Sequence, residues 1–420
     1  MKHGKFLLAF AIMFSSIINA SGQVKVGAKV NTFKKELFNA AIKNQVEPKV
    51  MGYQYVLIKD GKIAAEGAGG KARTGSDGNM DMTPSTPQNV GSLIKFMSGT
   101  AMINLFEKPA AKTDSDYKKN GLQANLDRVV WAEFPKVWLG VIPGPYEKGV
   151  TQRRITFRHL LQHQSGFDEE WKGPKTDGTF PSQLKNQFNA DLFGTRKYAN
   201  VNFTLASYLL PLLESHNLNY DLDIETNGLS MTEGDKLVRD KLGLRMDALM
   251  RERIWNKMSP KFNATCDPKN VVKNTAAYGY PSKQAKGGGE FYSMKETIGH
   301  CVAVGGYYTS ARDFANYVAH FSQTDLVVTE AGRNAMFNDK TPKDDQLVWS
   351  SATYNKWISD NFKMPLVAWS DGAAGGVRTV LLRLPDNYYL VLFATSPEIN
   401  SGGLFNVGVS AFQEGMKHNF

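Results

Sequence analysis

The chain has 420 residues, of which 42% are hydrophobic and 11% aromatic, so it holds enough apolar material for a large folded core. Charged residues make up 21% of the chain, a fraction that excludes wholesale disorder. The net charge of +10 comes from scattered lysines and arginines, without the basic runs and interleaved aromatic residues typical of nucleic-acid binding. Binding of cell-envelope polyanions through this charge is an alternative that composition alone leaves open.

The first feature along the chain is a basic start followed by a short apolar run. Lys2 and Lys5 precede the apolar residues 6–18, and small residues follow at 19–22. This pattern is typical of a signal peptide, and the run is too short to anchor the chain across a bilayer. We therefore expect residues 1–22 to be a signal peptide, no later membrane span, and an exported protein that is periplasmic or secreted.

Two β-hairpins are predicted near the two ends of the remaining chain. Residues 53–67 form two apolar runs around an Asp-Gly turn, and residues 377–394 do the same around Pro-Asp-Asn. Helical spacing of apolar residues predicts five helices between and around them. These predicted helices cover residues 31–45, 92–107, 203–214, 246–258 and 405–417, whereas 71–87 is predicted to be a loop and 216–243 an insertion.

This order of elements predicts an α/β (α+β) fold. Strands from both ends of the chain are expected to join in one antiparallel sheet flanked by helices, with a mostly helical lobe packed against it. The expected single domain covers residues 23–420, with an α/β lobe at about 23–90 and 300–420 and a helical lobe at about 91–299.

The chain has two cysteines, Cys266 and Cys301. In an oxidising compartment they could form one disulfide that closes a loop of about 35 residues; the alternative is two buried free thiols. Neither lies in a metal-ligand spacing, and the seven histidines are dispersed, so we expect no metal or other cofactor.

Ser92 and Lys95 form the first candidate catalytic pair. If Ser92 opens a helix, Lys95 lies one turn further on the same face. A serine hydroxyl is a weak nucleophile unless a nearby base takes its proton, and a lysine can do so when burial lowers its pKa. A Ser-x-x-Lys pattern also arises by chance at ordinary helix starts, so its context decides its meaning.

Two further motifs follow the Ser-x-x-Lys pair. Residues 155–167 read Ile-Thr-Phe-Arg-His-Leu-Leu-Gln-His-Gln-Ser-Gly-Phe, and Tyr198-Ala199-Asn200 precedes an apolar helix. In this order, the three motifs resemble those of class C β-lactamases and their relatives, which include D-alanyl-D-alanine carboxypeptidases and family VIII esterases. The resemblance extends over about residues 30–415 and implies a β-lactamase/transpeptidase-like fold.

The resemblance also implies roles for these residues. Ser92 would attack a carbonyl carbon and become acylated, while Lys95 and Tyr198 would share proton transfer. Asn200 would orient the substrate or Lys95 by hydrogen bonding. The backbone N–H of Ser92 would supply half of an oxyanion hole. His163 belongs to a segment that is structural in this family, so we expect it to pack behind the site.

The third catalytic motif of the family, which follows Ser-x-x-Lys and Tyr-x-Asn, departs from its usual pattern in this chain. A Lys-Thr-Gly or His-x-Gly strand is expected opposite the serine, but this chain has Ser370-Asp371-Gly372 there. Ser370 can still form hydrogen bonds, Gly372 keeps the family glycine, and the Ala373 N–H could complete the oxyanion hole. Arg378 is a candidate for replacing the lost positive charge.

These observations predict a serine hydrolase that acts on a small-molecule or peptide substrate through an ester, amide or peptide bond. Without the cation of the third motif, substrates with a free carboxylate lose a charge-assisted hydrogen bond, so a standard β-lactam is a less favoured substrate. The alternative is a catalytically weak or inactive binding protein that keeps the penicillin-binding-protein fold.

Overall fold

The computed structural model describes residues 33–109, 115–139, 154–170, 178–266, 275–290, 298–338, 346–349 and 368–416. The expected signal peptide lies outside these residues. All statements below concern the described part of the chain.

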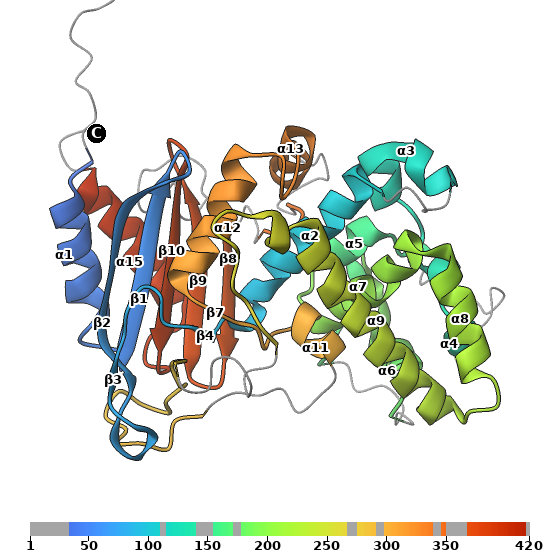
Figure 1. Cartoon of the computed structure of the whole chain (residues 1–420), viewed down its shortest axis with the longest axis horizontal. Coiled ribbons are helices and arrows are strands. Elements are labelled where there is room, and N and C mark those ends of the chain that lie inside the picture. The colour runs from blue at the N-terminus through green and yellow to red at the C-terminus, as the bar shows by residue number, and fades with distance from the viewer. Residues whose placement is uncertain are drawn as a thin grey trace, which may run out of the picture.

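A six-stranded antiparallel sheet joins the two ends of the chain, in the order β3-β2-β1-β10-β9-β8 (Figure 1). Its central pair is β1 with β10, which are in register from Gly52 opposite Thr395 to Lys59 opposite Tyr388. The predicted single sheet is therefore confirmed. The strands are β1 (Gly52–Lys59), β2 (Lys62–Arg73), β3 (Met80–Asp81), β8 (Ala368–Ala374), β9 (Val377–Leu384) and β10 (Tyr388–Thr395).

Both predicted hairpins form, and their turns explain their sequences. Asp60 and Gly61 have φ values of 47° and 75°, and Asp386 and Asn387 have values of 56° and 59°. Two successive left-handed residues match the twist of the flanking strands, and Asp, Asn and Gly tolerate that conformation best. The region predicted as a loop after the first hairpin differs, because β2 continues to Arg73 and pairs with β3.

Helices cover both faces of the sheet. α1 (Lys35–Val46) and α15 (Ser401–Gly415) pack together on one face, and α12 (Ala311–Gln323) covers the other (Figure 1). Alternate residues of a strand point to opposite faces, and every residue of β10 is buried, as expected for a strand covered on both sides. The predicted terminal helices are confirmed with shifted ends, because α1 begins after Lys34 and α15 ends at Gly415.

The remaining helices pack around α2 (Ile94–Glu107) and α7 (Asn200–Glu214), which are almost entirely buried. Residues 216–243, which were expected to be an insertion before the next helix, are themselves helical. They form α8 (His216–Thr226) and most of α9 (Met231–Arg253), whose start is fixed by a reciprocal capping box between Ser230 and Glu233. The shorter elements are η1 (Gly75–Asp77), β4 (Gln88–Asn89), η2 (Gly91–Leu93), α3 (Ser115–Leu126), η3 (Val130–Glu133), α4 (Lys136–Leu139), α5 (Phe157–Leu161), β5 (Ser165–Phe167), α6 (Phe180–Gln187), β6 (Phe188–Phe193), η5 (Trp255–Lys257), α11 (Ile298–Ala303), β7 (Tyr308–Thr309) and α13 (Glu330–Asn338).

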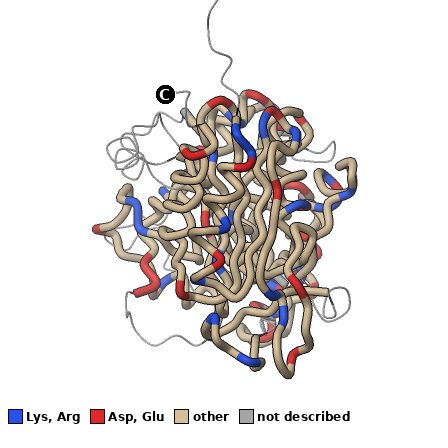
Figure 2. The backbone as a smooth tube through the Cα atoms, turned by 90° about the vertical axis from the view of Figure 1, so that its left-hand side faces the viewer, with Lys and Arg blue, Asp and Glu red and all other residues tan. Residues whose placement is uncertain are grey.

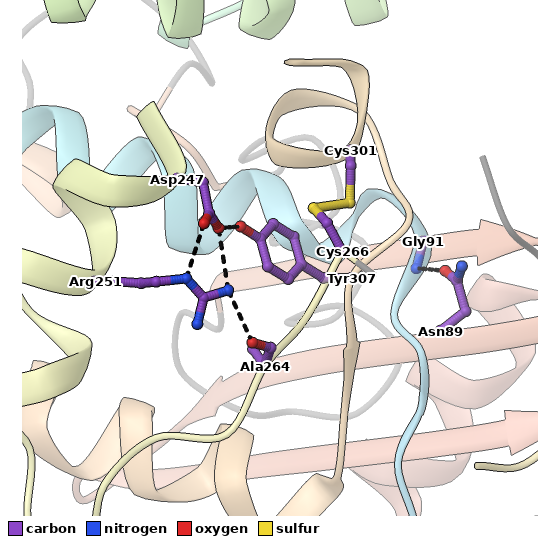
Figure 3. Close-up of a disulfide and its surroundings, with 8 residues drawn as sticks. All are labelled: Asn89, Gly91, Asp247, Arg251, Ala264, Cys266, Cys301 and Tyr307. Atoms are coloured by element: carbon purple, nitrogen blue, oxygen red, sulfur yellow. Dashed lines mark hydrogen bonds and ion pairs between the residues drawn. A yellow bond between two sulfur atoms is a disulfide. The ribbon is translucent and has the colours of Figure 1, made fainter. Parts of the chain in front are cut away.

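Cys266 and Cys301 form a disulfide, with their Cα atoms 6.0 Å apart (Figure 3). The bond ties α11 to the segment before Cys266, where Thr265 pairs with Tyr308 through two backbone hydrogen bonds. Of the two states left open by the sequence, the structure therefore has the cross-linked one. The disulfide holds the chain before Val304, the residue that follows α11, and the pairing of Thr265 with Tyr308 holds it after Val304.

Charges of both signs are interspersed along the backbone in the view of Figure 2. Within the described ranges, no helix combines the length and the apolar character needed to cross a bilayer.

We predict that replacing both cysteines, as Cys266→Ser with Cys301→Ser, lowers the free energy of unfolding by about 3–4 kcal/mol, because the unfolded chain regains the entropy of a 35-residue loop. Urea denaturation measures this change. Wild-type protein unfolded with a thiol reductant should behave like the double variant, and a loss below about 1 kcal/mol would contradict the prediction.

Candidate active site

The turn η2 holds Ser92 at the junction between the sheet and α2. The Asn89 side-chain oxygen accepts a hydrogen bond of 2.7 Å from the Gly91 N–H (Figure 3). The Val90 N–H donates to the Tyr307 carbonyl at 3.0 Å. Gly91 has a φ of +54°, a left-handed conformation that glycine adopts at little cost. This local geometry reverses the chain just before Ser92, and α2 then starts at Ile94.

The structure brings the residues of the Ser-x-x-Lys and Tyr-x-Asn motifs together. Lys95 Nζ donates to Ser92 Oγ at 3.1 Å, as expected for residues one helical turn apart. The Tyr198 hydroxyl lies 2.9 Å from Ser92 Oγ, although the two residues are 106 positions apart. Ser92 Oγ therefore has two hydrogen-bonding partners, Lys95 in the first turn of α2 and Tyr198 just before α7.

The amino group of Lys95 is held by two more acceptors. It donates to Asn200 Oδ1 at 2.8 Å and to the Val304 carbonyl at 3.0 Å, and the residue is only 4% exposed. Burial lowers the pKa of Lys95 to about 7, while the negative charges of Glu169 and Asp371 act in the opposite direction. A large fraction of this lysine is therefore a neutral amine near pH 7, which is the form that can accept a proton.

Tyr198 packs against the ring of His163. The His163 ring lies with its centroid 4.7 Å from the Tyr198 ring, and its Nδ1 accepts a hydrogen bond from the Ala199 N–H. Burial holds the pKa of His163 well below its ordinary value, so the ring is neutral. Burial also raises the pKa of Tyr198 to about 12, so its phenol stays protonated at neutral pH. His163 thus supports Tyr198, as the resemblance implied.

Glu169 is a participant that the sequence analysis missed. Its carboxylate accepts hydrogen bonds of 3.1 Å from Asn200 Nδ2 and from the Val201 N–H at the start of α7. These bonds leave the Asn200 side-chain oxygen facing Lys95 and the Tyr198 hydroxyl. No sequence signal marks Glu169, because it follows the segment 155–167 in a polar stretch and its partners lie about 30 residues away.

The strand β8 runs close against η2 on the other side of Ser92. A methyl group built at Gly91 would lie 2.7 Å from the Ala373 nitrogen, and one at Gly372 would lie 2.1 Å from the Val90 carbonyl oxygen. Thr379 on β9 donates to the same Val90 carbonyl at 2.8 Å. Both glycines are needed for this close approach, which brings the backbone of Ala373 next to the turn that carries Ser92.

A cavity of about 310 Å³ opens at Ser92. Ser370 and Asp371 contribute to its wall from β8, and Arg196 contributes from the segment before Tyr198. Arg378, the candidate substitute for the missing cation, is not among the described lining residues; its side chain donates instead to the neighbouring Val377 carbonyl. The described residues that line the cavity are Ser92, Lys95, His163, Arg196, Tyr198, Phe203, Val348, Trp369, Ser370 and Asp371.

Within the described ranges, no group of three or more His, Cys, Asp or Glu side chains converges as a metal site would require. What the arrangement offers is a hydroxyl, a buried amine and a neutral phenol, with the backbone of β8 packed against the turn that carries the hydroxyl. That set is suited to acyl transfer to a serine.

Comparison with known proteins places this fold in a known class. Residues 38–215 match the sequence model of the Beta-lactamase family. No curated protein matches the sequence. Together with the structural similarities below, the family match confirms the resemblance of this chain to the β-lactamase-related serine hydrolase superfamily.

Three solved structures illustrate the shared fold. FmtA from Staphylococcus aureus is 14% identical with a TM-score of 0.59, and the match covers 92% of each chain. A class C β-lactamase from Rhodobacter sphaeroides is 13% identical with a TM-score of 0.59, covering 91% of this chain and 99% of the other. A β-lactamase/D-alanine carboxypeptidase from Yersinia pestis is 16% identical with a TM-score of 0.58, covering 90% and 98%. The fold supports a function of the serine hydrolase type.

We predict that Gly91→Ala destabilises the protein and slows any reaction of Ser92, because the new methyl group pushes β8 away from η2. The matched control is Gly228→Ala in the turn between α8 and α9, where φ is also positive, +82°, but no atom lies within 4 Å of the added group. Urea denaturation should show a loss about 1–3 kcal/mol larger for Gly91→Ala than for the control. Equal losses would mean that the close approach of β8 is not a constraint.

Proposed function

We propose that the protein is an exported serine hydrolase that acts through an acyl-enzyme on Ser92. The observation that carries the proposal is the hydrogen-bonded set of Ser92, Lys95, Tyr198 and Asn200, of which the first three line one cavity. A structural role alone does not require a buried lysine beside a serine hydroxyl, since burying an amine carries a desolvation cost.

The proposed reaction has two halves. In the first, Ser92 Oγ attacks the carbonyl carbon of an ester or amide while its proton passes to the neutral amine of Lys95. The carbon–heteroatom bond then breaks, and the leaving group takes this proton from Lys95 through the Tyr198 hydroxyl, so the amine is neutral again. In the second half, water attacks the acyl carbon and its proton passes to the same base. The bond to Ser92 Oγ breaks, Ser92 Oγ takes that proton back, and the acid product leaves.

Lys95 and Tyr198 have different proposed shares in proton transfer. With its pKa near 7, Lys95 has a populated neutral form at physiological pH and serves as the base. Tyr198, with a pKa raised to about 12, stays a phenol that can pass a proton between Ser92 and the leaving group. The backbone N–H groups of Ser92 and Ala373 are the proposed donors to the oxyanion, supported by the close packing of β8 on η2.

Ser370 bears on the proposed choice of substrate. It is 6% exposed and lines the cavity, so a hydroxyl occupies the place of the cation expected in this family. We therefore propose an ester, amide or peptide substrate, with standard β-lactams and other carboxylate-bearing molecules disfavoured. The same departure supports the alternative of a binding protein that keeps the fold without turnover.

Two features support export. The basic start and apolar run of residues 1–22 are typical of a signal peptide. The Cys266–Cys301 disulfide suits an oxidising compartment such as the periplasm or the extracellular space.

Covalent labelling tests the acyl-enzyme proposal. We expect a fluorophosphonate to increase the intact mass of the wild-type protein by one phosphonyl group. Ser92→Ala should abolish this labelling and lower the esterase activity on 4-nitrophenyl acetate by at least about 10⁴-fold. Ser98→Ala is the matched control, because the Ser98 hydroxyl donates within α2 to the Ile94 carbonyl and does not line the cavity. Wild-type protein that stays unlabelled and inert would favour the binding-protein alternative.

The pH dependence tests the role of Lys95. Lys95 must be neutral to accept a proton, so the acylation rate should rise about tenfold per pH unit below pH 7 and level off above it. Tyr198→Phe should lower the plateau by about 10²–10⁴-fold without removing the rise. Stopped-flow measurement of 4-nitrophenol release gives both quantities. An acid limb with its midpoint near pH 10 would contradict the proposed base.

A further inference from the structure

Asp371 is an acidic side chain in the cavity wall, and it follows Ser370 in the segment that stands in place of the family's Lys-Thr-Gly or His-x-Gly. It lies on β8 opposite Val380 and lines the cavity together with Ser92 and Lys95. Its carboxylate is close enough to influence both Lys95 and Tyr198, whose pKa values its negative charge raises. The hydroxyl of Ser401, the first residue of α15, donates a hydrogen bond to it.

Burial and two positive charges act on the Asp371 carboxylate in opposite directions. Burial has the largest effect and raises the pKa of Asp371, while the hydrogen bond from Ser401 and the charges of Lys95 and Arg196 favour the ionised form. A carboxylate in this condition gains more from one further cation or charged N–H donor than a fully paired carboxylate would. The described part of β8 supplies no such group, since its other polar side chains are those of Trp369 and Ser370.

The position of Asp371 also links substrate charge to the state of Lys95. The negative charge of Asp371 raises the pKa of Lys95 and so favours its protonated form, which cannot act as a base. A substrate cation beside Asp371 would offset that effect and favour the neutral amine. A substrate with a carboxylate at the same place would be repelled by Asp371.

We propose that Asp371 is a specificity-determining residue that selects substrates with a cationic group, such as an ammonium, that enters the cavity at Ser92. The proposal rests on the proposed hydrolase function and adds the substrate class to it. The strand that would bind a carboxylate through a lysine or histidine carries a serine here, and the carboxylate of Asp371 lies next to it.

Two matched pairs of esters test this inference, one with the charge on each side of the ester bond. 4-Nitrophenyl 6-aminohexanoate is compared with 4-nitrophenyl heptanoate, and acetylcholine with 3,3-dimethylbutyl acetate. Members of a pair have nearly the same shape and differ by one positive charge. For each pair, the ratio of kcat/KM for the cationic over the neutral ester is measured with wild type and Asp371→Asn. We expect the substitution to lower this ratio about tenfold in at least one pair, the effect of losing one charge-assisted interaction.

Asp386→Asn is the matched control variant. It makes the same change of charge in the exposed turn between β9 and β10, where asparagine tolerates the left-handed φ of 56°. Its ester ratios should equal those of the wild type. Asp371→Glu, which keeps the charge, should retain part of the preference. With the neutral esters, Asp371→Asn should also move the acid limb of the pH profile to lower pH, because the charge that raises the pKa of Lys95 is gone.

The outcomes separate this inference from the proposed function. If the wild type hydrolyses neither neutral ester and Ser92 is not labelled, the hydrolase proposal fails. If neutral esters are hydrolysed through Ser92 but both ratios are unchanged by Asp371→Asn, only the charge preference is overturned. A shifted pH profile without a changed ratio also overturns it, since Asp371 would then act on Lys95 alone.

Discussion

The pairing of β1 with β10 joins segments more than 300 residues apart, and the geometry of the site depends on it. β10 carries β9, β9 carries β8, and β8 lies against the turn that presents Ser92. The pairing is stabilised because the central strands are apolar on both faces and are covered by α1 and α15 on one side and α12 on the other. The strand β8, near the end of the chain, is thereby held against the turn that carries Ser92, which lies in the first quarter of the chain.

Lys95 is the point at which the sheet side and the helical side meet. Its amine contacts Ser92 in its own turn, Asn200 at the start of α7, and the Val304 carbonyl just after α11. The disulfide of Cys301 and the pairing around Tyr308 fix the chain before and after Val304, so the acceptor on that side is constrained from both directions. A buried amine with three fixed oxygen partners has a defined position, and its lowered pKa follows from the same burial.

The charges around Ser92 come from distant segments and oppose one another. Glu169 orients Asn200 and Asp371 faces the cavity, while Arg196 and Lys95 supply the positive side. Because burial strengthens the interactions of Lys95, the negative charge of Asp371 on β8 has consequences both for the base and, as proposed, for the substrate. Ser370 stands in place of the family's cation and Asp371 lies next to it, so both residues change the charge of the same part of the cavity wall.

The sequence by itself determined the elements whose signals are local. The Asp-Gly and Pro-Asp-Asn turns between apolar runs fixed both hairpins, and the order of three motifs indicated the family and the group of Ser92, Lys95, Tyr198 and Asn200 that the fold brings together. The helix α8 and the first part of α9 were not predicted, whereas the helix predicted at 246–258 overlaps the end of α9; a capping box at Ser230 sets the start of α9. Only the tertiary structure decided the partners of Lys95, the place of Glu169, the closed disulfide and the inward position of Asp371, since each depends on contacts between segments far apart in the chain.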